Sequence, residues 1–150
     1  MKKFKFILSL LIISINSESS IATTSGIVEQ GDCSTKKIQI MKPEFPPAAV
    51  SGYVVVNFTI NESGALENIR AGESMCVLVS KRNKSAEMKS CGIFKRYAIN
   101  AAHFLKYNPP LNSKKEACSL QGVEHRYTFY HEKSDLIENT LKEHFLSKNN

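Results

Sequence analysis

The sequence predicts an α+β domain, in which a small antiparallel sheet in the order β-β-α-β packs on a helix and an additional C-terminal helix follows. Residues 53–60 place apolar side chains at every second position, residues 93–106 place them every three to four positions, and residues 134–145 repeat this longer period. Alternation is typical of a half-buried strand, and the longer period is typical of a helix facing a core. Both element types therefore belong to one packed domain.

The first two strands are expected to form a hairpin. Residues 53–60 are rich in β-branched and aromatic side chains, and residues 61–64 end in a glycine and indicate a turn. A second strand is expected over residues 65–71. Its residues Leu66 and Ile69 can share one face only if the strand contains a bulge. Residues 72–91 are expected to leave the sheet as a loop, although their apolar start could instead prolong the second strand.

The remaining elements follow from the apolar period and its end signals. A helix over residues 93–106 is stopped by Pro109, and a third strand covers residues 122–131. Ser134 is expected to cap the last helix, with Asp135 in its first turn.

The N-terminus has the three parts of a secretory signal peptide. Lys2, Lys3 and Lys5 precede an apolar run over residues 6–15, and a small residue, Ala22, ends the polar stretch that follows. The run is about half as long as the ~20 residues of a membrane-spanning helix. We expect cleavage near Ala22 and export to the periplasm; an uncleaved anchor is the alternative.

Three parts of the chain are therefore expected: a signal peptide (1–22), an extended leader (23–42) and one domain (43–150). The formal net charge of +6 falls to +4 with the signal peptide, and no dense Lys/Arg block alternates with aromatic residues. Nucleic acid is therefore not an expected partner. No later apolar stretch is long enough to span a membrane.

Four cysteines, Cys33, Cys76, Cys91 and Cys118, follow the expected cleavage site. An even number in an exported domain indicates two disulfides, and no two are spaced closely enough for a typical zinc site. Of the three pairings, we favour Cys76 with Cys91, which bracket one local segment, and Cys33 with Cys118 by elimination. A closed loop of about 15 residues contributes about 3 kcal/mol in the chain-entropy estimate.

The sequence contains no pattern typical of catalysis. It lacks a Gly-x-Ser-x-Gly elbow, a His-Glu-x-x-His pair and a phosphate-binding glycine loop. We expect a binding module rather than an enzyme, with no catalytic residues, no metal and no cofactor.

Residues 43–109, with the third strand, resemble the C-terminal domain of the TonB family, which serves outer-membrane transport. Phe45-Pro46 and Ala49 stand at the family's Tyr-Pro entry and following alanine. The first strand matches the family pattern at Gly52, Val54, Val56, Phe58 and Ile60, and the hairpin matches it at Gly64 and Leu66. An Ala-rich turn (Ala98, Ala101, Ala102) precedes Leu105-Lys106-Tyr107-Asn108-Pro109, where the family has Trp-x-Phe-x-Pro. Leu105 departs from the family tryptophan, and the chain carries no long Pro-rich spacer that would transmit force.

The resemblance implies binding by strand addition, in which a segment of an envelope protein, such as an outer-membrane receptor, pairs with the last strand of the sheet. The partner-binding residues would then be Glu124, Arg126, Thr128 and Tyr130. A terminal helix that covers this edge would make the strand a purely structural element. Edge pairing between two copies, giving a homodimer, is another alternative.

A second hypothesis concerns the segment between Cys76 and Cys91. A secreted, disulfide-stapled effector or inhibitor could use this loop as a binding finger. Its apolar start lies beside Lys81, Arg82 and Lys84.

Overall fold

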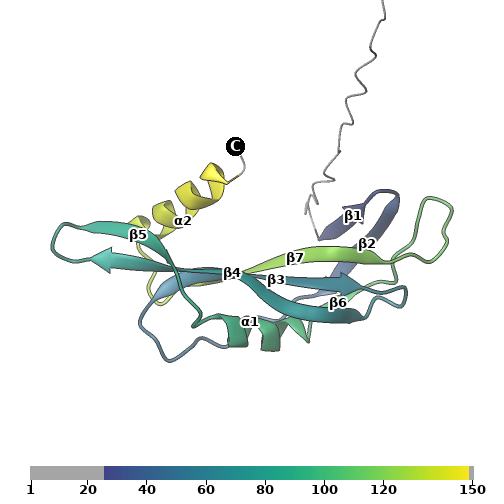
Figure 1. The fold of residues 1–150 in the computed structure, drawn as a ribbon, viewed down its shortest axis with the longest axis horizontal. Coiled ribbons are helices and arrows are strands. Elements are labelled where there is room, and N and C mark those ends of the chain that lie inside the picture. Colours follow the sequence, from purple (N-terminus) through teal and green to yellow (C-terminus); the bar gives the residue numbers. More distant parts are fainter. Residues whose placement is uncertain (1–25, 149–150) are drawn as a thin grey trace, which may run out of the picture.

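The computed structural model describes residues 26–148, so the predicted signal peptide lies outside the described residues. Along the chain the elements are β1 (Ile27–Gln30), β2 (Cys33–Gln39), β3 (Ser51–Ile60), β4 (Leu66–Ser80), β5 (Ser85–Ser90), α1 (Lys95–Ala102), β6 (Lys106–Tyr107), β7 (Leu120–Phe129) and α2 (Asp135–Ser147). One sheet has the order β1-β2-β6, and the other has the order β5-β4-β3-β7 (Figure 1).

The predicted fold class is wrong. Strands make up 46% and helices 17% of the structure, and the strands form two sheets that curl into a half-barrel. The fold is therefore dominated by sheets and is not a small β-β-α-β sheet packed on a helix. The additional strands are β1 and β2 in residues 27–39, β5 in residues 85–90, and the short β6 at the end of the predicted first helix.

The predicted leader contains the β1–β2 hairpin. Gln30 is paired with Cys33, so the turn consists of Gly31 and Asp32 alone, and Gly31 has a positive φ of 63° that suits a tight turn. Only Val28, Cys33 and Thr35 are buried in this hairpin. Most positions of these two strands therefore carry polar side chains, which explains why their sequence resembles a loop.

The strand β3 lies in the middle of the four-stranded sheet and is buried along most of its length. It pairs with β4, and the register shifts between Asn57 and Thr59, where Asn68 on β4 has a φ of 55°. This irregularity lets both Leu66 and Ile69 pack against the main core, as the sequence predicts. Beyond it, β4 continues to Ser80, so the alternative in which the apolar start of residues 72–91 prolongs the second strand is confirmed, and the chain then turns into β5.

The first helix is shorter than predicted, because the chain leaves the helix after Ala102 and enters β6. Leu105 and Tyr107 are both buried, and β6 pairs with β2 at Lys37 and Gln39. The apolar side chains that the sequence assigned to the end of a helix therefore reach the core from an extended segment.

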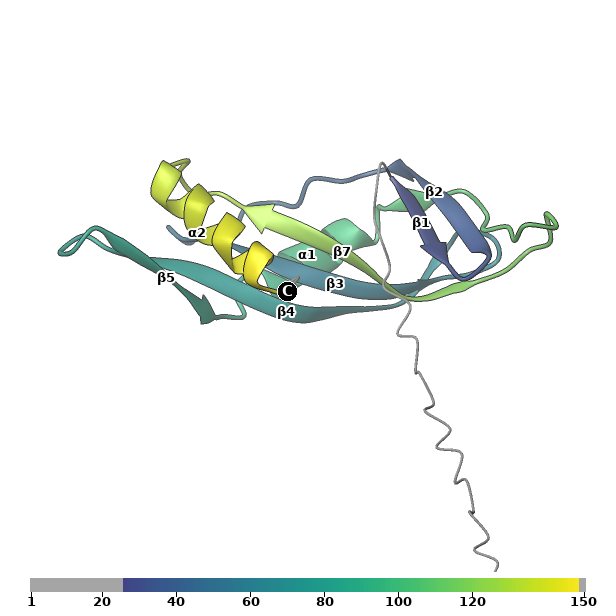
Figure 2. The same cartoon turned by 90° about the horizontal axis from the view of Figure 1, so that it is seen from above.

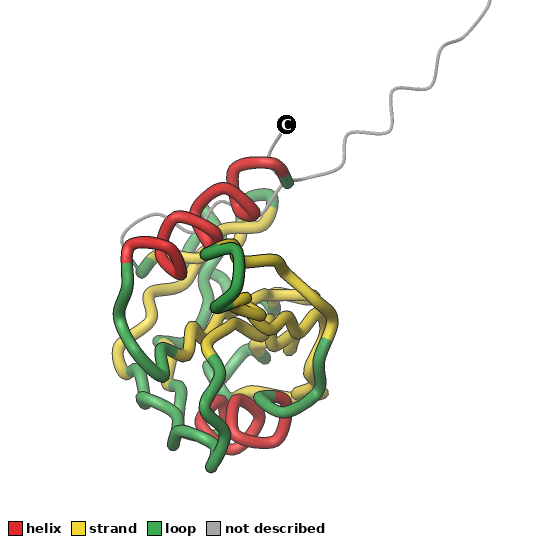
Figure 3. Tube along the Cα trace, turned by 90° about the vertical axis from the view of Figure 1, so that its left-hand side faces the viewer, coloured by secondary structure: helices red, strands yellow, loops and turns green. Residues whose placement is uncertain are grey.

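The two helices lie on opposite sides of the four-stranded sheet (Figure 3). The main core joins one face of that sheet to α1 and to the small sheet, and includes Phe94 stacked on Phe129 with ring centroids 4.4 Å apart. On the other face, Ile137 and Leu141 of α2 pack on Tyr53 and Val77. As predicted, the Ser134 side chain accepts a hydrogen bond from the Ile137 amide and caps α2, with Asp135 in the first turn.

Over residues 26–148, no helix is both long and apolar enough to cross a membrane.

Candidate partner-binding edge

The strand β7 is an edge of the four-stranded sheet. It pairs antiparallel with β3 from Gly52↔Phe129 to Ile60↔Leu120, and within residues 26–148 no other strand pairs with it. In an antiparallel ladder, alternate residues of an edge strand turn their N–H and C=O groups away from the neighbouring strand. These groups are where an added strand would form hydrogen bonds.

The start of this edge is closed by one side chain. The Gln30 side-chain amide donates to the Gln121 carbonyl oxygen at 3.1 Å, and its oxygen accepts from the Gln121 amide at 3.0 Å. Next to it, Gly122 has a φ of 62°, where the register with β3 shifts by one residue. The open part of the edge therefore begins at Val123.

The four predicted partner-binding residues lie along this open part but differ in their surroundings. Glu124 is exposed, Thr128 is half-buried, and Tyr130 is 38% exposed just beyond the end of β7. The Arg126 guanidinium lies over the Phe145 ring of α2, 3.7 Å from its centroid. Within residues 26–148, neither Glu124 nor Arg126 forms an ion pair.

The helix α2 covers a face of the sheet and leaves the edge of β7 open. It contacts β4 and β5, and in Figure 2 it lies over one face of the four-stranded sheet. Its last turns are held by the Tyr53 hydroxyl, which lies 2.8 Å from His144 Nε2, and by Glu73, which contacts both His144 and Lys148. The same surface forms a cleft of about 250 Å³ that includes Glu124 and Arg126.

A half-buried polar contact lies on the other side of β7. Lys37 Nζ of β2 is 3.0 Å from His125 Nδ1. Burial and, to a smaller extent, the Lys37 charge lower the pKa of His125 to about 4, and burial also lowers the pKa of Lys37. An ammonium can only donate, so Nδ1 accepts and the ring hydrogen lies on Nε2. This contact ties the small sheet to β7 through a neutral histidine.

Two tyrosine hydroxyls beside this contact are buried and have no hydrogen-bond partner among the described residues. They belong to Tyr107, whose ring lies 5.8 Å from Lys37 Nζ, and Tyr127, whose ring meets His125 edge-on. Burial raises the pKa of Tyr127 to about 12, and burial together with the neighbouring Tyr127 raises the pKa of Tyr107. Both hydroxyls therefore keep their protons at neutral pH and are available as hydrogen-bond donors.

The prediction of two disulfides is confirmed, and the pairs are Cys33–Cys118 and Cys76–Cys91, the pairing that the sequence favours. The first joins the start of β2 to the segment before β7. The second joins β4 to Cys91, the residue that follows β5, so the predicted stapled loop exists as a β-hairpin.

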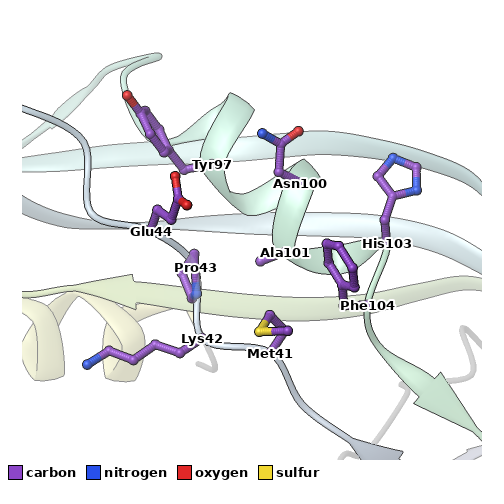
Figure 4. Close-up of a pocket in the computed structure, with 9 residues that line it drawn as sticks. All are labelled: Met41, Lys42, Pro43, Glu44, Tyr97, Asn100, Ala101, His103 and Phe104. Atoms are coloured by element: carbon purple, nitrogen blue, oxygen red, sulfur yellow. The ribbon is translucent and has the colours of Figure 1, made fainter.

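A cleft lies between α1 and the segment that enters β3 (Figure 4). It has a volume of about 530 Å³ and apolar walls that include Met41, Pro43, Ala101 and Phe104. In Figure 4 the Lys42 side chain extends away from α1, while Glu44 lies near Tyr97. Among the described residues, neither Lys42 nor Glu44 forms an ion pair.

Sequence reasoning missed Gln30 and Lys37, because both lie in the segment assigned to the leader. A signal was present: the dipeptide Gly31-Asp32 between two short runs is typical of a two-residue hairpin turn. The contacts themselves join residues that are 88 and 91 positions apart, and no local pattern indicates them.

Among the described residues, no group of three or more His, Cys, Asp or Glu side chains could hold a metal ion. Comparison with known protein families, with curated proteins and with solved structures gave no match for this chain.

Proposed function

We propose that this chain is a protein-binding module of the periplasm, which takes an extended segment of an envelope protein as an added strand along β7. The observation that carries the proposal is the unpaired outer edge of β7 from Val123 onwards, within residues 26–148. The sequence resemblance to the TonB C-terminal domain favours the same mode of binding. The β1–β2 hairpin and the long β4–β5 hairpin are departures from the predicted pattern.

The two edges of the sheet differ in a way that favours β7. The opposite edge, β5, has six residues and carries the exposed ion pair Glu87–Lys89, with 2.8 Å between the charged atoms. Short, charged edges resist strand addition. The strand β7 has ten residues, and its charges on the α2 side are not paired with one another or with other described residues.

The free charges also limit which strands can pair. An added strand would place side chains opposite Glu124 and Arg126, where opposite charges stabilise a cross-strand pair and like charges destabilise it. A partner segment with a basic and an acidic residue two positions apart would satisfy both. We expect such a segment to bind more tightly than one with the two charges exchanged.

The test is photocrosslinking in intact cells from a probe at Glu124, compared with a matched probe at Glu87 on the opposite edge. The expected result is an envelope protein captured at Glu124 and not at Glu87. The captured segment is then synthesised, and its binding should slow hydrogen exchange at alternate amides of β7 and leave β5 unchanged. Equal capture at both edges would contradict strand addition. Capture only from a probe at Lys81 would move the function to the β4–β5 hairpin, as in the effector hypothesis.

A further inference from the structure

The outer end of the β4–β5 hairpin projects beyond the body of the protein. We call residues 78–85 the hairpin tip. In Figures 1 and 2 the hairpin extends past both helices. The disulfide Cys76–Cys91 and the packing of Ala86 and Met88 near α2 fix its base. A rigid base holds the tip away from the rest of the surface.

The hairpin tip is strongly basic. Lys81, Arg82 and Lys84 lie within four residues at its apex, and all three are exposed. Residues 78–86 contain no acidic side chain, and the next acid along the chain, Glu87, is paired with Lys89. Three positive charges are therefore presented together without a neutralising neighbour within the hairpin tip.

Two exposed apolar side chains lie directly behind these charges. Leu78 is 40% exposed and Val79 is 44% exposed. They are consecutive on β4, so they point to opposite faces of the hairpin. Val79 shares a face with Val77, which packs against α2, and Leu78 shares the other face with Cys76.

We propose that the hairpin tip binds the anionic phospholipid surface of a bilayer, with Lys81, Arg82 and Lys84 among the headgroup phosphates. A convex, basic projection can reach a flat charged surface without contact between that surface and the protein body. Basic side chains near an anionic membrane each contribute to binding through the surface potential. Apolar groups on both faces suit a headgroup layer that surrounds the hairpin.

An acidic protein is a less suitable partner for the same residues. A specific protein interface buries about 800 Å² on each partner, contributed by about 20–30 residues. The hairpin tip offers eight residues, and its apolar side chains face in opposite directions. Binding to an anionic bilayer instead depends on the number of basic residues near its surface.

The position of the tip is compatible with the strand addition proposed above and does not depend on it. The strands β5 and β7 are the two opposite edges of one sheet. A molecule held at a membrane through the β4–β5 hairpin would therefore keep the β7 edge free for a partner.

The test is cosedimentation of the chain from residue 23 onwards, which contains every described residue, with two kinds of vesicle. One kind is phosphatidylcholine alone, and the other has equal parts of phosphatidylcholine and phosphatidylglycerol. We expect binding to the anionic vesicles only, weakening as salt rises. The variant K81E/R82E should lower the partition coefficient by at least about tenfold. The matched variant K36E/K106E makes the same change in net charge at exposed residues of β2 and β6, and should lower it by less than about threefold.

A further variant, L78S/V79S, should weaken binding while leaving the salt dependence unchanged, because it removes apolar contacts and no charge. Thermal melts show whether each variant is folded, and all of these positions are exposed. Equal binding to both kinds of vesicle would overturn the proposal. Equal losses in the two charge variants would also overturn it, because they would assign binding to net charge. Absence of vesicle binding, with K81E/R82E abolishing a protein crosslink instead, would assign the tip to an acidic protein.

Discussion

The side-chain amide of Gln30 forms with the backbone of Gln121 the same pair of hydrogen bonds that a neighbouring strand would form. Its nitrogen and oxygen lie 3.1 and 3.0 Å from the Gln121 carbonyl oxygen and amide nitrogen. One side chain thus ends the open edge of β7 at a defined residue. An added strand can pair only beyond it.

Replacing Gln30 with alanine should extend the open edge by one pair of hydrogen bonds. We expect faster hydrogen exchange at the Gln121 amide and a loss of about 1 kcal/mol or less in the free energy of unfolding. Exchange measured by NMR checks this result. The variant Q39A, in the same hairpin, is the control and should leave Gln121 unchanged; unchanged exchange in Q30A would show that the amide does not close the edge.

Gly52 should not tolerate a side chain. A Cβ atom there would lie 2.1 Å from the Met75 carbonyl oxygen and 2.6 Å from Phe94 Cε2. We expect G52A to lower the free energy of unfolding by at least about 2 kcal/mol, since the contact is with backbone. Urea denaturation measures the change. The matched control is G92A, where nothing lies within 4 Å of the added atom, and a similar loss in both variants would contradict the packing described here.

Stability should fall with acid because of His125. In the unfolded chain this histidine takes up a proton near its ordinary pKa of 6.5, whereas burial and Lys37 hold its pKa in the folded protein at about 4. The unfolded state therefore binds more protons between these values, and the free energy of unfolding decreases as pH falls from 6.5 to 4. Above pH 6.5 this contribution is fully present.

In thermal melts across this pH range, the melting temperature should change less steeply with pH in H125Q than in the wild type. Lys37, Tyr107 and Tyr127 remain in place in that variant, so the difference reports the histidine. Replacement of the exposed His103 by glutamine is the control. A slope that is unchanged in H125Q would show that other groups cause the acid dependence.

Arg126 and Phe145 should couple α2 to the edge strand. The cation–π contact at 3.7 Å is partly exposed, and contacts of this kind contribute about 0.5–1 kcal/mol. A double-mutant cycle with R126A and F145A, followed by chemical denaturation, should give a coupling energy in this range. A coupling near zero would contradict a stabilising role of this contact.

The two disulfides should contribute unequally. Their sequence separations are 85 for Cys33–Cys118 and 15 for Cys76–Cys91. In the chain-entropy estimate, replacing the first pair by serines costs about 4–5 kcal/mol and replacing the second costs about 3 kcal/mol. Denaturation of the two double variants under matched conditions checks the order, and a larger loss for the second pair would contradict it.

The sequence predicts correctly those elements whose signals are local. The strand around Val54 and Val56 alternates strongly, Ser134 caps α2 in the predicted way, and the bulge that Leu66 and Ile69 require is present. In each case the residues that form the element also carry the pattern. The pairing of the cysteines that the sequence favours among three alternatives is likewise the one observed.

The missed strands form hairpins with their neighbours in the sequence, but they pack against elements that are distant in the sequence. The strand β5 reads Ser-Ala-Glu-Met-Lys-Ser, and only Ala86 and Met88 pack against the core beneath α2. The hairpin of β1 and β2 buries one apolar side chain per strand, Val28 and Cys33. Polar strands of this kind form because a neighbouring strand or helix is already in place, and their own composition resembles a loop. The error in fold class follows directly from these two segments.

The nesting of one disulfide inside the other has a consequence for how the chain matures. Cys76 and Cys91 both lie between Cys33 and Cys118 in the sequence. A chain that enters an oxidising space from its N-terminus presents Cys33 and Cys76 first, and bonding these two in order of arrival gives a wrong pair. The native pair of Cys33 forms only after the last cysteine has emerged. A chain oxidised as it enters should therefore reach its native pairs through thiol–disulfide exchange, on the timescale of seconds to hours, and a disulfide isomerase should accelerate this step.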